Sequence, residues 1–393
     1  MDRKAIREFP SHRPDVTGPL TELASFREER PVRIRIPEGG RAWLVTRYAD
    51  VRALLADERV SADDTRPGFP QVLPGAKPGE LSFTRMDGPE HSRLRRMLTA
   101  EFTVRRIHAM RPRIEQVVDG LVDTLVREGG PVDLVRGFAL PLPTLVICDL
   151  LGVPYEDHEF FQTRGAALFS ANPPEMVGAA FGELAGYLDE LVARKEREGA
   201  DDLLGRVAAR VDAGELTHEE AVAMARVLLL AGHETTANAL ALSVLTLLRH
   251  PDQLATLCER PELYPSAVEE LLRLLTITQG PMPRLATEPI EVGGVRIEAG
   301  DGILMSLLAA NRDERVHTGP DELDVHRDAG RHLAFGHGVH QCLGQSLARL
   351  ELEVALPALF RSLPGLRLAC AESDLRLRAE SPVYGVDALP VTW

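Results

Sequence analysis

One cysteine stands in a glycine-rich segment that could hold a metal ion. The segment reads FGHGVHQCLG over residues 335–344, with Cys342 among three glycines and a helical pattern directly after it. Glycines let the backbone turn tightly and approach a flat partner closely. The N-terminus of the following helix would direct N–H groups and positive dipole toward the sulfur, which favours a thiolate. We therefore interpret Cys342 as a candidate thiolate ligand; a small buried cysteine in a tight turn is the alternative.

Two histidines in the same segment, His337 and His340, raise the question of zinc. Together with Cys342 they supply three ligands, and no second cluster in the sequence completes a tetrahedral site. The other three cysteines form neither a CxxC pair nor a zinc-ligand spacing. Zinc is therefore the weaker interpretation of this segment.

A second candidate for chemistry interrupts the longest apolar run of the chain. Residues 221–248 are mostly Ala, Leu, Val and Met, but His233, Glu234 and Thr235 lie near the middle. A buried acid beside a hydroxyl is a candidate proton relay. The alternative is a polar contact between helices, in which the threonine hydroxyl can also bond the carbonyl four residues back and bend the helix.

Helical periodicity dominates the elements that must position these residues. It covers residues 91–128 and most of the chain from about 134 to 250. Thr217–Glu220 forms a capping box that opens the apolar helix, and His250-Pro251 closes it. A further helix is expected over residues 342–362, directly after the candidate ligand.

Strand patterns are confined to two regions, about 31–60 and 285–310. In the second region, EPIEVGGVRI predicts a hairpin that turns at Gly293-Gly294. Residues 61–90 contain five prolines and four glycines, which predicts a long connection of the kind that is usually functional. The expected fold class is mainly α with a smaller β portion.

Composition narrows the class of protein. The 393 residues are 44% hydrophobic and 26% charged, as in globular proteins with a large core, and no linker divides them. A net charge of −14 argues against a nucleic-acid partner. The N-terminal MDRKAIREFP has no apolar stretch, and Arg226, Glu234 and Asn238 interrupt residues 221–248. We therefore expect a cytoplasmic protein with a buried core helix and no membrane span.

Taken together, these motifs resemble the cytochrome P450 family. FGHGVHQCLG is similar to the family's haem-binding pattern FxxGxxxCxG, and Phe335, Gly338, Cys342 and Gly344 occupy its fixed positions. AGHETT over residues 231–236 is similar to the oxygen-activating motif (A/G)Gx(D/E)T, where many members have Asp in place of glutamate. The resemblance covers essentially the whole chain and is nearest to soluble actinobacterial members. It implies one catalytic domain over residues 1–393, with a long central helix over a haem held by a cysteine loop.

The resemblance also implies the roles of individual residues. Cys342 would be the iron ligand of haem b (iron protoporphyrin IX), and Glu234 and Thr235 the catalytic proton donors. Two propionates call for cations. The remaining haem-binding residues implied by family position are His91, Arg95, Arg284, Phe335, Gly336, His340 and Gly344.

Glu270 and Arg273 match the family's ExxR motif, a structural pair that supports the haem-binding core. By themselves, an acid and an arginine three residues apart indicate only a possible ion pair on one helix face. Residues 321–327 resemble the meander that completes this network, although Leu323 stands where the family often has Phe.

The function implied by the resemblance is a haem-thiolate monooxygenase. It would activate O2 with two external electrons and hydroxylate or epoxidise a hydrophobic small molecule, a secondary metabolite or a xenobiotic. No GxGxxG follows a strand, so the electrons should come from NAD(P)H through a ferredoxin reductase and a ferredoxin. The candidate pocket residues share an apolar side chain and a family position near the substrate: Phe69, Leu81, Phe83, Phe169, Met176, Leu230 and Met282.

Three other functions are weighed against this one. A non-catalytic recruitment module of the same fold would be expected to lose Cys342 or the Glu234–Thr235 pair. A peroxide-driven peroxygenase typically replaces that pair with an arginine-containing arrangement, and a haem-based gas sensor would not need it. Aryl coupling stays open within the leading class.

A local basic segment contrasts with the acidic chain. Its arginines are Arg93, Arg95, Arg96, Arg105, Arg106, Arg111 and Arg113. On one interpretation they orient an acidic ferredoxin and speed its encounter. On the other, they are solvated or paired with nearby acids.

Overall fold

The computed structural model describes residues 8–9, 13, 15–18, 20–36, 40–72, 78–79, 82–157, 159–161, 163–164, 174–379 and 381–393. The chain divides into two compact units. The first unit comprises Met1–Leu94, His250–Gln345 and Leu377–Gly385, and the second comprises Arg95–Arg249, Ser346–Arg376 and Val386–Trp393. Three candidate regions fall in the first unit (the cysteine loop, Arg284 and the ExxR pair), whereas the acid–alcohol pair falls in the second.

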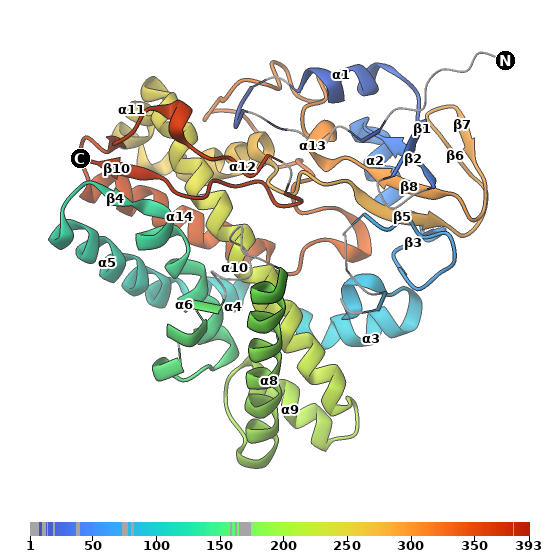
Figure 1. Ribbon diagram of the computed structural model, residues 1–393, viewed down its shortest axis with the longest axis horizontal. Coiled ribbons are helices and arrows are strands. Elements are labelled where there is room, and N and C mark those ends of the chain that lie inside the picture. Colours follow the sequence, from blue (N-terminus) through green and yellow to red (C-terminus); the bar gives the residue numbers. More distant parts are fainter. Residues whose placement is uncertain are drawn as a thin grey trace. The chain divides into compact units, whose positions relative to one another are not determined.

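The first unit contains the main sheet, formed by strands far apart in the sequence (Figure 1). Its strands, in spatial order, are β1 (Val32–Arg35), β2 (Arg41–Val45), β8 (Gly302–Met305), β5 (Met282–Ala286) and β3 (Val60–Ser61). Only β2 and β8 run parallel; the other neighbours are antiparallel. The predicted hairpin is present as β6 (Ile290–Val292) and β7 (Val295–Ile297), with positive φ at both glycines of its turn. This geometry explains why two glycines stand there.

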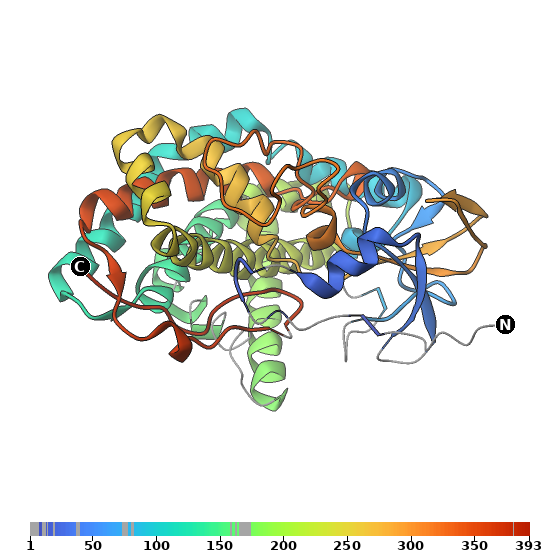
Figure 2. The same cartoon turned by 90° about the horizontal axis from the view of Figure 1, so that it is seen from above.

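The first unit also contains helices, of which only some lie beside the sheet (Figure 2). They are α1 (Thr21–Glu28), α2 (Tyr48–Leu55), η1 (Ser82–Arg85), α3 (Gly88–Thr99, which runs on into the second unit), α11 (Pro251–Glu259), η4 (Pro261–Leu263), α12 (Tyr264–Leu275), α13 (Leu307–Ala310) and η5 (Gly338–His340). Val51 and Leu54 of α2 join Ile303 and Met305 of β8 in one buried cluster. The sheet and the short helices beside it therefore share a core.

The second unit is mostly helical. Its elements are α4 (Val104–Ala109), α5 (Arg111–Glu128), β4 (Val132–Asp133), the π-helix η2 (Val135–Ala139), α6 (Pro141–Leu151), η3 (Tyr155–Asp157), α8 (Pro174–Glu198), α9 (Leu203–Asp212), α10 (His218–Arg249), α14 (Gln345–Ser362), β9 (Arg367–Leu368), η6 (Glu372–Asp374) and β10 (Pro390–Thr392). The three short strands form a sheet in the order β4-β10-β9. The prediction of a mainly α protein with a smaller β portion is confirmed.

Helix α10 is the apolar helix predicted from residues 221–248. Thr217 and Glu220 cap its start reciprocally, with N···O distances of 2.9 Å and 3.2 Å. By length and composition the helix could cross a membrane, but 78% of its most apolar window is buried inside the protein. It packs against α6, α8 and α9. These contacts support the interpretation of a core helix.

Candidate active site

The cysteine loop is closed by its own backbone. The amide of Cys342 donates to the carbonyl of Phe335 at 2.8 Å, and the amide of Gly336 donates to Leu333 at the same distance. Gly336 and Gly338 have φ values of 69° and 74°, in the left-handed region that favours glycine. A Cβ on Gly338 would lie 2.3 Å from the carbonyl oxygen of Leu55. The loop is therefore pressed against the end of α2 at a point where only glycine fits.

Within this loop, the Cys342 side chain is exposed and forms no disulfide. Helix α14 begins at Gln345, three residues later than the sequence pattern suggested. Cys342 thus precedes the first turn of the helix rather than opening it. An accessible thiol just before a helix N-terminus is suited to act as a thiolate ligand.

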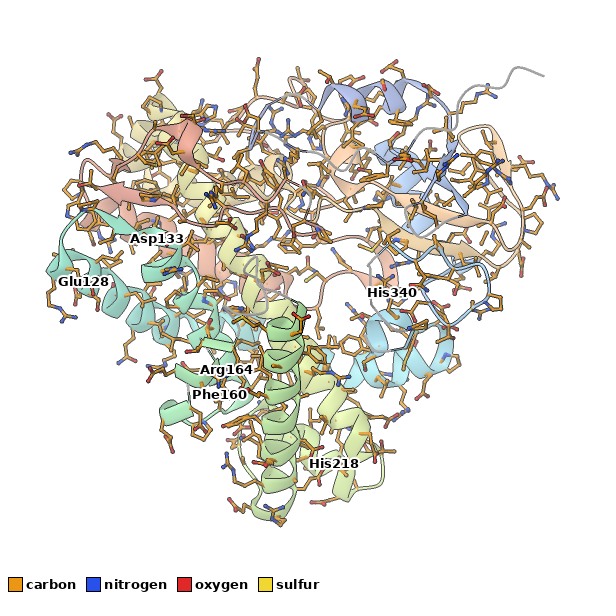
Figure 3. The ribbon with its side chains drawn as sticks, viewed as in Figure 1. Glu128, Asp133, Phe160, Arg164, His218 and His340 are labelled. Atoms are coloured by element: carbon orange, nitrogen blue, oxygen red, sulfur yellow. The ribbon has the colours of Figure 1, made fainter. Side chains whose placement is uncertain are left out.

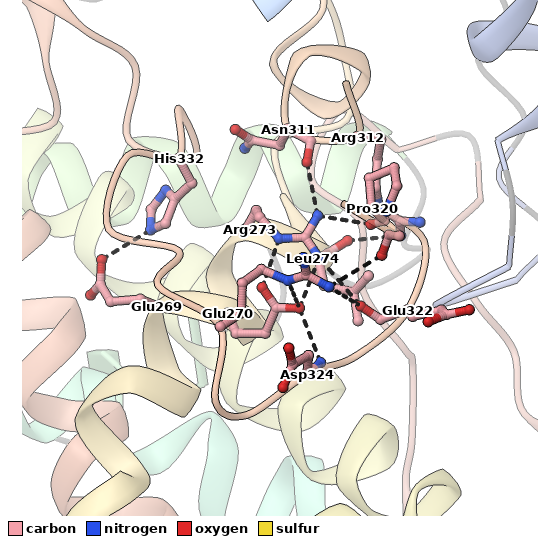
Figure 4. A network of polar contacts seen from close by, with 12 residues as sticks. Glu269, Glu270, Arg273, Leu274, Asn311, Arg312, Pro320, Glu322, Asp324 and His332 are labelled. Carbon is pink, nitrogen blue, oxygen red and sulfur yellow. Dashed lines mark hydrogen bonds and ion pairs between the residues drawn. The ribbon is translucent and has the colours of Figure 1, made fainter. Parts of the chain in front are cut away.

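A buried polar network around Glu270 and Arg273 supports the cysteine loop (Figure 4). Glu270 and Arg273 are both 0% exposed and form a bidentate ion pair at 2.7 Å and 2.8 Å. The Glu270 carboxylate also accepts from Arg327, at 3.0 Å. The pairing of Glu270 with Arg273 that the sequence suggested is thus present, at the centre of the network. A buried pair needs such further hydrogen bonds to offset its desolvation.

Asn311 connects this network to the cysteine loop. Arg273 donates to the Asn311 carbonyl at 2.9 Å, and the Asn311 side chain accepts from the Leu333 amide at 2.6 Å. The side-chain amide of Asn311 also donates to Thr276 at 2.8 Å. Sequence reasoning missed Asn311, because its partners lie up to 38 residues away in the chain.

Two of the predicted propionate-binding residues meet in the first unit. The rings of His91 and His340 lie 4.2 Å apart between centroids, where the cysteine loop passes the start of α3 (Figure 3). Arg284 on β5 is 5% exposed and donates to the carbonyl of Pro283 at 2.8 Å. Arg95 is half-buried one turn after His91 on α3, at the start of the second unit.

Asp87 is a further member of this group that the sequence did not single out. Its carboxylate accepts from the Ser61 hydroxyl and from the Ala62 amide, and it lies 3.7 Å from the His340 ring nitrogen. Partial burial alone would raise the pKa of Asp87, but His340, Ser61 and Ala62 outweigh it and hold the pKa well below its usual value. Asp87 therefore stays ionised and positions His340.

The acid–alcohol pair lies on α10 in the second unit. The Thr235 hydroxyl donates to the Ala231 carbonyl at 2.7 Å, and the Asn238 side chain donates to the Glu234 carbonyl at 2.9 Å. The Glu234 side chain is buried. Helix α10 is continuous from His218 to Arg249, so this threonine bond does not interrupt it. Burial lowers the pKa of the neighbouring His233 to about 4, so its ring is uncharged at neutral pH.

Known proteins resemble this chain over nearly its full length. The family model described as cytochrome P450 matches residues 187–364. Cytochrome P450-SU2 of Streptomyces griseolus is 52% identical over 384 residues, which cover 96% of this chain and 94% of that protein. Mycinamicin VIII C21 methyl hydroxylase of Micromonospora griseorubida is 48% identical, with 95% and 96% covered.

The chain is a cytochrome P450. The crystal structure of cytochrome P450 MoxA from Nonomuraea recticatena matches this P450 with a TM-score of 0.92 and 47% identity, covering 98% of each chain. The fold expected from the resemblance is thereby confirmed. The protein is a monooxygenase that uses haem b, the cofactor of this family and fold.

The side chains of this P450 fit haem. The exposed Cys342 thiol is suited to hold the iron. Burial lowers the pKa of Arg284 to about 10, and no carboxylate among the described residues lies within 4.0 Å of its guanidinium. A buried cation needs an anion, and a propionate would supply one.

The predicted pocket residues have different surroundings. Phe69 and Phe83 are buried in the first unit, and Met282 packs against the core cluster around β8. Leu230 is partly buried on α10. Met176 is 53% exposed near the start of α8, which does not support a lining role. The remaining two predictions, Leu81 and Phe169, lie outside the described residues.

Proposed function

We propose that this P450 hydroxylates or epoxidises a hydrophobic small molecule, using electrons that a ferredoxin and its reductase deliver from NAD(P)H. The observation that carries the proposal is the exposed Cys342 thiol in a loop fastened by the buried Glu270–Arg273 network. The intact Glu234–Thr235 pair supports oxygen activation rather than a recruiting role. The name of the mycinamicin relative, which states a methyl hydroxylation, supports a secondary metabolite as the substrate class.

In the proposed mechanism, Cys342 holds the haem iron as a thiolate. When bound, the haem supplies the oxygen-activating chemistry. Arg284, His91, Arg95 and His340 would bind the propionates. Glu234 holds a proton at its carboxyl group, and Thr235 passes protons through its hydroxyl, which must first turn away from the Ala231 carbonyl.

The location and partners of the protein complete the proposal. The acidic chain, with 59 Asp and Glu against 45 Lys and Arg, is not suited to nucleic acid. The buried surroundings of α10 support a protein that works in the cytoplasm without a membrane span. Electron delivery by a separate protein follows from the lack of a nicotinamide-binding motif in the sequence.

The test is reconstitution of the purified haem protein with a ferredoxin, its reductase and NADPH. Candidate hydrophobic compounds are first screened for a haem spin-state shift, and those that bind are incubated with isotopically labelled dioxygen. We expect one labelled oxygen atom in the product. Turnover that requires added peroxide and ignores the ferredoxin, or binding without any product, would contradict the proposed function.

A further inference from the structure

Arg85 is a half-buried arginine in the first unit to which no role has been assigned. It ends η1, two residues before Asp87. Its Nη1 atom is buried and has no hydrogen-bond partner among the described residues. The guanidinium carbon lies 5.6 Å from the centre of the Phe69 ring, which offers an apolar face and no counter-charge beyond its quadrupole.

Strand pairing brings Arg284 to the same place. Ser61 on β3 is paired with Leu285, the residue next to Arg284 on β5. Asp87 binds the Ser61 hydroxyl and the Ala62 amide, which ties the segment of Arg85 to this edge of the sheet. After burial, the positive charge of Arg85 is the next cause that lowers the pKa of Arg284. The two guanidinium groups therefore share one neighbourhood.

The nearby acids are engaged elsewhere. Asp64 accepts from the Gly79 amide at 2.8 Å. Asp87 accepts from Ser61 and Ala62 and lies beside the His340 ring. Burial lowers the pKa of Arg85, and the charge of Asp64 only partly opposes this. Across the described part of the chain, no carboxylate lies within 4.0 Å of either guanidinium. Two like charges, one buried and one half-buried, with no carboxylate within ion-pair distance, need an external anion.

We infer that Arg85 and Arg284 together bind a carboxylate, with Arg85 as a further anion-binding residue of this P450. A planar guanidinium donates two parallel hydrogen bonds to a carboxylate, which is the group that two such side chains recognise best. The carboxylate comes from a haem propionate or from the substrate. The inference rests on the proposed haem site, because Arg284 is assigned to that site.

The experiment compares holoenzyme variants Arg85→Gln and Arg85→Lys with the wild type. The matched control is Arg59→Gln, because Arg59 is an exposed arginine of the same unit that is already paired with Asp57. Each variant must retain the ferrous–CO band of thiolate ligation. If the wild type itself lacks that band, the proposed role of Cys342 is wrong. Failure of the proposed haem site can therefore be distinguished from failure of the Arg85 inference. Arg85→Lys keeps the charge and serves if the glutamine variant does not fold.

The first arm measures transfer of haem to excess apomyoglobin and the ferric/ferrous potential. If a propionate is the partner, Arg85→Gln loses haem about 10- to 100-fold faster, as expected for a lost hydrogen bond to a charged group. Its potential also falls, because a positive charge has been removed. Arg85→Lys should keep the potential near the wild-type value, which a purely structural effect would not predict.

The second arm titrates dodecanoate against methyl dodecanoate by the haem spin-state shift. If the substrate provides the carboxylate, the wild type prefers the acid by about 10- to 100-fold, and Arg85→Gln removes this preference. Haem loss then stays unchanged. The inference is overturned by a negative result in both arms. In the first arm, Arg85→Gln, Arg59→Gln and wild type lose haem equally fast. In the second arm, Arg85→Gln leaves the acid-to-ester ratio of affinities unaltered, or neither probe binds.

Discussion

At the scale of single residues, the two candidate groups Cys342 and Thr235 differ in their surroundings. The Cys342 thiol is exposed while its backbone amide is held by Phe335. Thr235 is the opposite case, because its hydroxyl is occupied by the Ala231 carbonyl. The Thr235 hydroxyl must therefore turn away from this carbonyl before it can pass a proton in the proposed mechanism.

Replacing Cys342 tests the iron ligand. The Cys342→Ala variant should lack the strongly red-shifted ferrous–CO Soret band, because no thiolate is left to donate electrons to the iron. Cys258→Ala, which removes another exposed cysteine, should retain it. The assignment is wrong if the Cys342→Ala protein keeps the band.

Replacing Thr235 tests proton delivery. General acid–base groups accelerate a reaction by about 10²- to 10⁴-fold. Without this proton delivery, Thr235→Ala should bind haem and substrate yet divert reducing equivalents to peroxide. Its melting temperature should change little, because a threonine bond to the carbonyl four residues back hardly stabilises a helix. Thr236→Ala is the neighbouring control and should stay coupled. Unchanged coupling of NAD(P)H use to product in Thr235→Ala would rule out this role.

At the scale of elements, two connections hold functional segments in place. In the first unit, Asn311 links the Glu270–Arg273 network to the amide of Leu333 at the base of the cysteine loop. In the second unit, the ring of His218 at the start of α10 lies between Glu196 at 2.8 Å and Asp189 at 3.2 Å, both on α8 (Figure 3). Each of these two connections can be tested by replacing one of its residues.

The Asn311→Ala change should loosen the cysteine loop. It leaves the buried Leu333 amide unsatisfied, which costs about 1–3 kcal/mol of unfolding free energy, and it should speed haem loss. Gln253→Ala removes the acceptor of the Val325 amide, a contact of 3.1 Å that does not reach the cysteine loop. Thermal unfolding and haem transfer would be measured for both. If the two variants lose haem at the same rate, Asn311 has no specific role in holding the loop.

His218 should make the stability of the second unit depend on pH. Glu196, and more weakly Asp189, raise the pKa of His218 above its ordinary value of 6.5. A raised pKa means that the folded state favours the protonated ring, so the stabilisation is complete below 6.5 and is lost as the pH rises through the folded-state pKa. Solvent screening limits it to a few tenths of a kcal/mol, or about 1 kcal/mol at most.

The measurement is denaturant unfolding of wild type and His218→Gln at about pH 5.5 and about pH 8.5. The wild type should be the more stable of the two at the lower pH, and the difference should vanish at the higher pH. In a Glu196→Gln background the difference at the lower pH should shrink, because the main cause of the raised pKa is gone. A stability difference that grows as the pH rises would mean that the folded state does not favour the protonated ring.

At the scale of the whole molecule, the net charge of −14 means that an acidic ferredoxin, the proposed electron donor, could be attracted only by local positive regions. Much of the basic segment is neutralised. Ion pairs join Arg93 to Glu90, Arg106 to Glu101, Arg111 to Glu353 and Arg113 to Asp149. For these four of the seven arginines, the contacts favour the interpretation that they are paired with nearby acids rather than orienting a ferredoxin. Arg105 is exposed on α4 and has no ion pair within 4.0 Å in the described part of the chain.

Arg105 is therefore the most direct test of electrostatic steering. Arg105→Glu should slow reduction by an acidic ferredoxin at low salt, because it removes an exposed positive charge, and the difference should shrink at high salt. Arg127→Glu makes the same charge change on the exposed C-terminal part of α5 and should have no such effect. Stopped-flow reduction at two ionic strengths is the measurement. Equal rates for both variants at low salt would exclude steering through Arg105.

The sequence alone determined the features whose causes lie within a few neighbouring residues. The capping box of α10, the Gly293-Gly294 turn and the glycines around Cys342 each follow from local backbone geometry, and the haem-binding motif can be read directly. The surroundings of Asp87, Asn311 and Arg85 were decided by tertiary structure. Their partners lie on segments that only the strand pairing and the buried network bring together, as Ser61 and Leu285 are brought together by the pairing of β3 with β5. Whether a charge is buried, and whether an anion is left to pair with it, depends on such distant neighbours and not on the residues beside it in the chain.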